Sequence, residues 1–136
     1  MAASGFNPMR WNCQADGCFN VKRRPKIEVF ADCFPRRINF GDVDGLVELN
    51  SRFCLLEWKG DGGTLRRGQT LSFTAFTNEV GNLVLVVNGD AETMVVTGYS
   101  YFWGGHHYPS VTADLEALKV RIRKWAEWTE AARAEA

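Results

Sequence analysis

The stretch Phe53–Gly60, FCLLEWKG, decides the fold and raises the question of function. It begins as an apolar run typical of a buried strand, and it ends with an acid, Glu57, and a base, Lys59. Because alternate side chains of a strand share a face, Glu57 and Lys59 point to one side of the sheet and Trp58 to the other. The pair is either a surface ion pair at a fraying strand end or part of a catalytic site.

The segment before this strand is predicted to pair with it. Apolar residues recur through 38–49 in an extended rhythm, with a kink at Gly45, and Asn50-Ser51 has turn chemistry. Segments 38–49 and 53–58 therefore form an antiparallel hairpin.

The remaining segments predict further helices and strands around this hairpin. The run Leu83–Val87 is continuously apolar and mostly β-branched, which favours a strand buried on both faces. An apolar stripe with helical spacing follows the N-cap candidates Thr112 and Asp114, so the chain ends in a long helix. The other predicted elements are a short helix over 25–34, a helix over 65–78, a turn at 88–90, a strand over 94–102 and a loop around His106 and His107. The expected order is α-β-β-α-β-β-α, an α/β (α+β) fold with a mixed sheet flanked by helices.

Length and composition predict one globular domain. The chain has 136 residues, 46% of them hydrophobic and 24% charged. We expect an irregular arm over 1–20 and a domain over 21–136.

No apolar run approaches the ~20 residues that span a bilayer, and the N-terminus lacks the charged and then apolar segments of a signal peptide. The expectation is a cytoplasmic protein of a bacterial or phage-infected cell with no membrane partner. The 16 basic and 16 acidic residues balance, which argues against a histone-like, charge-driven nucleic-acid binder.

The cysteines offer a zinc site. Cys13 and Cys18 form a C-x4-C pair that could hold structural Zn²⁺ together with Cys33 or one of the two histidines. The other interpretation is that they are free thiols. Cys54 lies inside the apolar strand and is predicted to belong to the core. The adjacent histidines should point apart, which favours surface or hydrogen-bonded histidines over ligands of one metal.

The candidate chemistry lies where the predicted hairpin brings acids together. Asp42 and Asp44 share a face by the period of two, and pairing would place one or both beside Glu57 and Lys59. Carboxylates that converge repel each other unless a cation lies between them. Mg²⁺ takes one or two carboxylates together with waters and substrate phosphate, and a nearby lysine can stabilise the charge that develops on a phosphate. These groups are the minimum set for cleaving a phosphodiester.

The series Asp44, Glu57-Trp58-Lys59 and Gln69 in FGDVDGLVE…LLEWK…GQ resembles the PD-(D/E)XK nuclease superfamily, especially its small phage-type, Holliday-junction-resolvase-like and RecB-like members. The resemblance implies a restriction-endonuclease-like core of order αβββαβ between about residues 25 and 102. Val43 stands where the name-giving proline would precede Asp44.

The resemblance also implies roles for the residues that match. Asp44 and Glu57, with the Trp58 carbonyl, would bind Mg²⁺ or Mn²⁺, Lys59 would position or activate water, and Gln69 would orient Lys59 or contact the phosphate. Further metal ligands would be Asp42, an alternative to Asp44, and Glu28. The candidates for DNA contacts are Arg66, Arg67, Arg36 and Arg37.

The leading hypothesis is a metal-dependent deoxyribonuclease, an endonuclease rather than an exonuclease, with branched or phage DNA among its candidate substrates. One alternative is a non-catalytic nucleic-acid- or protein-binding factor on the same fold. Another is a zinc-stabilised DNA-binding module built on Cys13 and Cys18. A homodimer is expected, through the Trp125/Trp128 helix or the strand over 99–103. Without catalysis, Glu57 and Lys59 would be an ion pair and Gln69 a helix cap.

Overall fold

The computed structural model describes residues 25–60 and 62–135, which fall into two compact units. The first unit ends at Asp42 and the second begins at Val43. The predicted arm over 1–20, with Cys13 and Cys18, lies outside the described residues.

The described part of the first unit contains one helix, η1 (Ile27–Cys33), a 3-10 helix. The helix predicted over 25–34 is therefore confirmed in place. No residue of η1 is buried, and Phe30 and Phe34 pack edge-on against Phe40, with ring centroids 5.9 and 5.2 Å away. Residues 38–43 have no regular secondary structure, so the extended segment becomes a strand only at Gly45.

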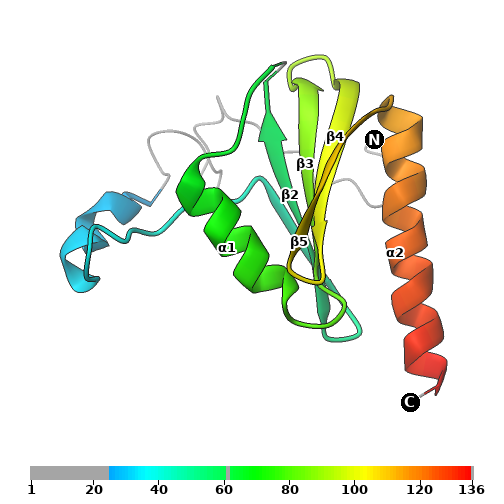
Figure 1. Cartoon of the computed structure of the whole chain (residues 1–136), viewed down its shortest axis with the longest axis horizontal. Helices are drawn as coiled ribbons and strands as arrows, with labels where there is room; N and C mark the ends of the chain where they lie inside the picture. Colours follow the sequence, from blue (N-terminus) through cyan, green and yellow to red (C-terminus); the bar gives the residue numbers. More distant parts are fainter. Residues whose placement is uncertain (1–24, 61, 136) are drawn as a thin grey trace, which may run out of the picture. The chain divides into compact units, whose positions relative to one another are not determined.

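The second unit is built on a five-stranded mixed sheet (Figure 1). The strands follow one another across the sheet in chain order, and only the β2–β3 pair is parallel. Their bounds are β1 (Gly45–Leu49), β2 (Arg52–Lys59), β3 (Leu83–Asp90), β4 (Val95–Trp103) and β5 (His106–Thr112). Helix α1 (Arg67–Thr77) connects β2 to β3, and α2 (Leu115–Glu135) follows β5. The coarse prediction of an α+β fold with a mixed sheet and a long C-terminal helix is confirmed.

The hairpin of β1 and β2 forms as predicted. The register pairs Leu49 with Arg52, which leaves Asn50 and Ser51 as the turn. Both turn residues have positive φ, 55° and 65°, as a type I′ turn requires. Among the described residues, two strands precede α1, whereas the αβββαβ order implied by the resemblance has three strands before its second helix.

Each face of the sheet is covered by a helix (Figure 1). Leu83, Leu85 and Val87 of β3 lie in one core cluster with Leu118 and Trp125 of α2. The intervening residues of β3 turn to the other face, where Val84 and Val86 cluster with Phe73 of α1 and with Leu55 and Phe102. The prediction that β3 is buried on both faces is confirmed.

The turn predicted at 88–90 is wrong. Strand β3 continues to Asp90 through an irregularity in its pairing with β4 between Asn88 and Gly89. Gly89 has φ +155°, and a Cβ there would lie 2.1 Å from the Val95 carbonyl oxygen. Gly89 is therefore needed for the close approach of β4, and its presence does not mark a turn here. The chain reverses instead over residues 91–94.

The loop predicted around the histidines is also wrong, because His106–Thr112 forms strand β5. Gly104 and Gly105, both with positive φ, make the turn from β4. Pro109 argued against a strand, but β5 is at the edge of the sheet, and its register with β4 shifts where Pro109 lies. Edge strands and bulges are the places where a sheet accepts proline.

Helix α2 begins as the sequence predicts. Oδ1 of Asp114 accepts a 2.9 Å hydrogen bond from the Ala117 N–H, which makes Asp114 the N-cap. The Trp125 indole donates to the Gly81 carbonyl at 2.8 Å, and the Thr129 hydroxyl donates to the Leu49 carbonyl at 3.1 Å.

Within the described ranges, no helix has both the length and the apolar content needed to cross a membrane.

Candidate active site

Glu57 is a buried carboxylate near the end of β2, the second of the five strands. It lies in β2 on the face that α1 covers, opposite Val86 of β3, and is only 7% exposed. Its neighbours on this face are largely apolar, because Leu55 and Val86 belong to the core cluster under α1. A carboxylate in such surroundings is stable only when other groups bond to it.

Gln69, in the first turn of α1, is one of these groups. Its Nε2 donates a 2.8 Å hydrogen bond to Oε1 of Glu57, and its Oε1 accepts the backbone N–H of Arg66 at 3.1 Å. The second bond is the one that a glutamine makes in a capping box. The sequence left open whether Gln69 caps the helix or serves the site, and the structure shows that one side chain contacts both the helix start and Glu57.

Lys59 is the second group that contacts Glu57. Its Nζ lies 3.4 Å from Oε1 of Glu57, and the two side chains are 17% and 10% exposed. Pairing with β1 ends at Leu56, so Glu57 and Lys59 pair with β3 alone. The low exposure of both side chains nevertheless shows that the ion pair is largely enclosed. Both Gln69 and Lys59 contact the same oxygen, and Oε2 of Glu57 takes part in neither contact.

Asp44 joins the site from the hairpin partner. It directly precedes β1, whose first residue, Gly45, pairs with Leu56. Oδ2 of Asp44 accepts a 2.6 Å hydrogen bond from the backbone N–H of Trp58. The carboxylate of Asp44 is thus fixed at the residue between Glu57 and Lys59, as the predicted hairpin required.

The donor set suits a hard divalent cation. In residues 25–60 and 62–135, no three side chains from His, Cys, Asp and Glu are grouped to hold a metal ion. Mg²⁺, however, uses only one or two carboxylates with waters and substrate phosphate. Asp44 is bonded to the Trp58 N–H, and Glu57 directly precedes Trp58 in β2, so these two carboxylates are the candidates for such a site.

Asn88 is a site residue that the sequence analysis assigned to a turn. It pairs with Lys59 across the parallel strands, and its Nδ2 donates to the carbonyls of Gly60 and Gly63 at 3.3 and 3.2 Å. Alternation along β3 could have revealed it, because Asn88 continues the face of Val84 and Val86.

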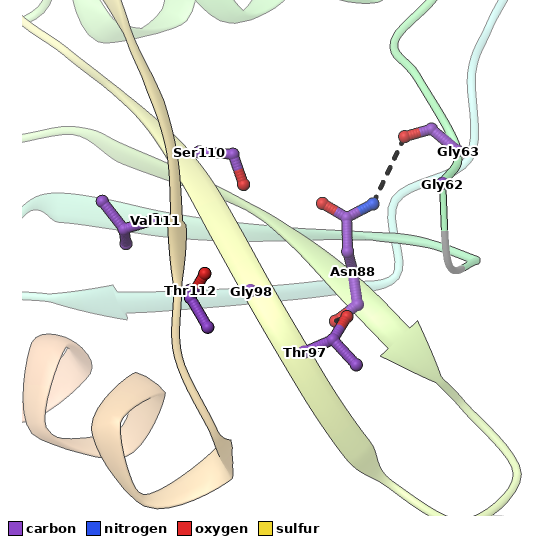
Figure 2. Close-up of a pocket in the computed structure, with 8 residues that line it drawn as sticks. All are labelled: Gly62, Gly63, Asn88, Thr97, Gly98, Ser110, Val111 and Thr112. Atoms are coloured by element: carbon purple, nitrogen blue, oxygen red, sulfur yellow. Dashed lines mark hydrogen bonds between the residues drawn. The ribbon is translucent and has the colours of Figure 1, made fainter.

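Beside Asn88 lies a polar pocket of about 290 Å³, shown in Figure 2, which we call the Asn88 pocket. It is formed by Gly62 and Gly63 and by the neighbouring strands β3, β4 and β5. Its lining residues are Gly62, Gly63, Asn88, Thr97, Gly98, Ser110, Val111 and Thr112.

The other predicted site residues have exposed side chains. Arg66 and Arg67 are exposed at the start of α1, close in sequence to Gln69. Glu28, Arg36, Arg37 and Asp42 are exposed residues of the first unit, and their roles stay predictions.

The described cysteines differ in environment. Cys33 is exposed and its zinc role stays a prediction. Cys54 is buried in the core as predicted, and this burial raises the pKa of its thiol to about 11.

The two histidines point apart as predicted. On the α1 face, the His107 ring stacks on Phe102 with centroids 4.1 Å apart, and Nε2 lies 3.0 Å from the Ser100 hydroxyl. Partial burial lowers the pKa of His107. His106 pairs with Trp103, whose side chain packs on the opposite face of the sheet.

Comparison of the chain with protein-family models, with curated proteins and with solved structures gave no significant match. What the protein does is therefore inferred from Asp44, Glu57, Lys59 and Gln69.

Proposed function

We propose that the protein is a metal-dependent deoxyribonuclease of the PD-(D/E)XK type, which hydrolyses phosphodiester bonds in DNA. One observation carries the proposal: the buried Glu57 forms a hydrogen bond with Gln69 and an ion pair with Lys59. Beside them, Asp44 is bonded to the backbone N–H of Trp58, the residue between Glu57 and Lys59. These residues come from β2, from the start of α1 and from the residue before β1.

The cluster is hard to explain by stability alone. Taking an acid and a base out of water is costly, and well-packed apolar residues in their place are often as stable or more so. Buried charges that gather several partners are therefore candidates for a functional site. The enclosure of Glu57 and Lys59 favours this interpretation over a surface ion pair.

The chain's own groups have distinct tasks in this mechanism. Asp44 and Glu57 would hold Mg²⁺ or Mn²⁺, which when bound polarises a phosphoryl oxygen and lowers the pKa of a coordinated water. The Lys59 ammonium would hydrogen-bond the attacking water or the negative charge that grows on the phosphate. Gln69 would hold Oε1 of Glu57 by its hydrogen bond, which leaves Oε2, outside this contact, as the candidate ligand oxygen. Water attacks phosphorus, the bond to one bridging oxygen breaks, and that oxygen leaves with a proton as a hydroxyl group.

The finer fold assignment is part of the same proposal. The order β1, β2, α1, β3, with the acid and lysine on β2 and the glutamine on α1, supports a match to the last two meander strands, second helix and final strand of the restriction-endonuclease-like core. The exposed Arg66 and Arg67 would contact DNA phosphates and orient the substrate without reading sequence.

The test is cleavage of labelled DNA: duplex, single strand, flap and four-way junction, each with Mg²⁺, Mn²⁺ or EDTA. We expect metal-dependent cutting that Lys59→Ala and Glu57→Gln each abolish. Lys119→Ala serves as the control, because Lys119 forms an exposed ion pair with Glu116 on α2.

Circular dichroism would confirm that each variant is folded. Cutting that survives in both site variants would refute the assignment of the site. A folded wild-type protein that cuts no substrate would instead support the non-catalytic binding factor.

A further inference from the structure

We propose that the Asn88 pocket is a nucleoside-binding subsite, which receives the sugar and base of a nucleotide next to the phosphodiester that is cleaved. This inference rests on the proposed function, because it assigns the pocket to the same substrate. It adds a second contact region, beside the acids and the lysine, that would position the DNA strand.

The position of the pocket follows from the strand register. Lys59 pairs with Asn88, and Asn88 pairs in turn with Gly98 of β4. The pocket therefore begins one strand away from Lys59, and its Gly98 side lies two strand spacings away, about 10 Å. Lys59 and the pocket are also joined directly, because the Asn88 side chain bonds to the carbonyls of Gly60 and Gly63 in the segment that follows Lys59.

The hydrogen-bonding character of the pocket favours a neutral ligand with N–H or O–H donors. The Asn88 Nδ2 donates to the carbonyls of Gly60 and Gly63, so the side chain offers the pocket its Oδ1 acceptor. Figure 2 shows the bond to Gly63. The Gly63 N–H donates to the Gly60 carbonyl at 2.8 Å, and the Thr97 hydroxyl donates to the Asn88 carbonyl at 3.3 Å. These two donors are already engaged, and the hydroxyls of Ser110 and Thr112 can donate to or accept from a neutral ligand. A phosphate is bound instead by several donors or by cations.

Charge leads to the same conclusion. None of the described residues that line the pocket carries a charged side chain. The cation that would meet a phosphate is Lys59, next to the pocket. A nucleotide bound across the two regions would thus place its phosphate at Lys59 and its uncharged sugar and base in the pocket.

The floor of the pocket depends on Gly98. A Cβ at this position would lie 2.7 Å from the Val111 carbonyl oxygen and 3.6 Å from the Ser110 hydroxyl oxygen. The missing side chain lets β5 approach β4 and leaves open the space beside the Ser110 hydroxyl. The resulting volume, about 290 Å³, is close to the volume of about 300 Å³ at which small-ligand pockets begin, so it suits one nucleoside and no more.

The first experiment measures binding to the wild-type protein by amide chemical shifts. The probes are the common 2′-deoxynucleosides, their 5′-monophosphates and inorganic phosphate. We expect at least one nucleoside and its monophosphate to saturate shifts at Gly62, Gly63 and Gly98, and inorganic phosphate to leave these amides unchanged. Absence of saturable nucleoside binding, or phosphate alone causing the same shifts, would overturn the proposal.

A variant that fills the pocket provides the second test. Ser110→Phe should weaken nucleoside binding about tenfold or more, while Ser72→Phe, at an exposed serine of α1, should not. If Ser110→Phe does not fold, Thr112→Tyr fills the same space from the end of β5. Unchanged affinity in the folded filling variant would place the nucleoside elsewhere and refute the subsite.

The two proposals fail separately. In DNA cleavage, Ser110→Phe should raise KM, whereas Lys59→Ala should lower kcat. Nucleoside binding by a protein that cuts no DNA would refute the nuclease but retain the pocket as a nucleoside site. DNA cleavage without nucleoside binding would refute the subsite and leave the nuclease standing.

Discussion

Gln69 and Glu57 are joined by a 2.8 Å hydrogen bond from Nε2 to Oε1, which links the first turn of α1 to strand β2. Because the same glutamine also accepts the Arg66 N–H, the start of the helix and the orientation of the buried carboxylate depend on one side chain. A change at Gln69 should therefore affect both stability and activity.

We expect Gln69→Ala to lower the free energy of unfolding by about 1–3 kcal/mol, because Glu57 loses a buried donor and the helix start loses an acceptor. Gln69→Glu should also be destabilising, since it keeps an acceptor for Arg66 but places a second carboxylate beside Glu57. Urea denaturation measures both effects. Ser72→Ala, on the exposed side of the same helix, is the control, and wild-type stability in Gln69→Ala would show that the bond contributes nothing.

Metal binding should stabilise the fold through Asp44 and Glu57. A cation that binds only the folded state at 100 times its Kd adds about 2.7 kcal/mol, so Mg²⁺ should raise Tm in a concentration-dependent way. Asp44→Asn keeps an oxygen to accept the Trp58 N–H but loses the charge, so its Tm without metal should stay close to wild type and its response to Mg²⁺ should be lost.

Asp114→Asn is the matched control for this experiment. The same change at the N-cap of α2 keeps a good capping side chain and should retain the full response to Mg²⁺. An equal response to Mg²⁺ in Asp44→Asn and wild type would remove Asp44 from the metal site.

His107 should make stability depend on pH in mildly acidic solution. Burial lowers its pKa below the ordinary value of 6.5, so the folded protein binds this proton less well than the unfolded chain does. The contribution of His107 is therefore fully present above about pH 6.5 and is lost as pH falls through the lowered pKa. Urea denaturation at a series of pH values should show this loss in wild type and a smaller one in His107→Phe, which keeps a ring to stack on Phe102. His106→Phe, on the opposite face, should behave as wild type does, and identical pH profiles for all the proteins would refute the role of His107.

The described cysteines should differ in reactivity. Burial raises the pKa of Cys54 to about 11, and because the thiolate is the reactive form, this thiol should resist alkylation at pH 8 in the native protein. Cys33 is exposed and should be modified rapidly. Peptide mapping after a pulse of iodoacetamide, with and without urea, distinguishes the sites. Rapid native labelling of Cys54 would show that the core under α2 opens far more often than its packing implies.

Much of the site could be predicted because its geometry is local. The period of two in a strand places Glu57 and Lys59 together, and the Asn50-Ser51 turn sets the register that brings Asp44 to Trp58. Gln69 is in the first turn of the next helix, where a capping role can be predicted from the sequence. The contact of Gln69 with Glu57, in contrast, depends on how α1 crosses the sheet, and the sequence suggested Lys59 or the phosphate as its partner.

The errors arose where long-range pairing overrides local signals. Asn88-Gly89 has the composition of a turn, yet pairing with β4 extends the strand through it. Gly104, Gly105 and Pro109 indicate a loop, yet the edge of the sheet accepts β5 there. Both errors hid the Asn88 pocket, because its walls are the end of β3 and the strand β5.

The attachment of α2 has a consequence for how the protein is made. Its anchors reach far back along the chain, from Trp125 to Gly81 and from Thr129 to Leu49. Domains fold as their residues leave the ribosome, N-terminal parts first. Strand β2, which carries Glu57 and Lys59, is therefore synthesised long before the helix that covers its other face. A chain arrested before residue 115 lacks the helix that covers Leu83, Leu85 and Val87, so we expect these apolar side chains to stay exposed to water until synthesis is complete.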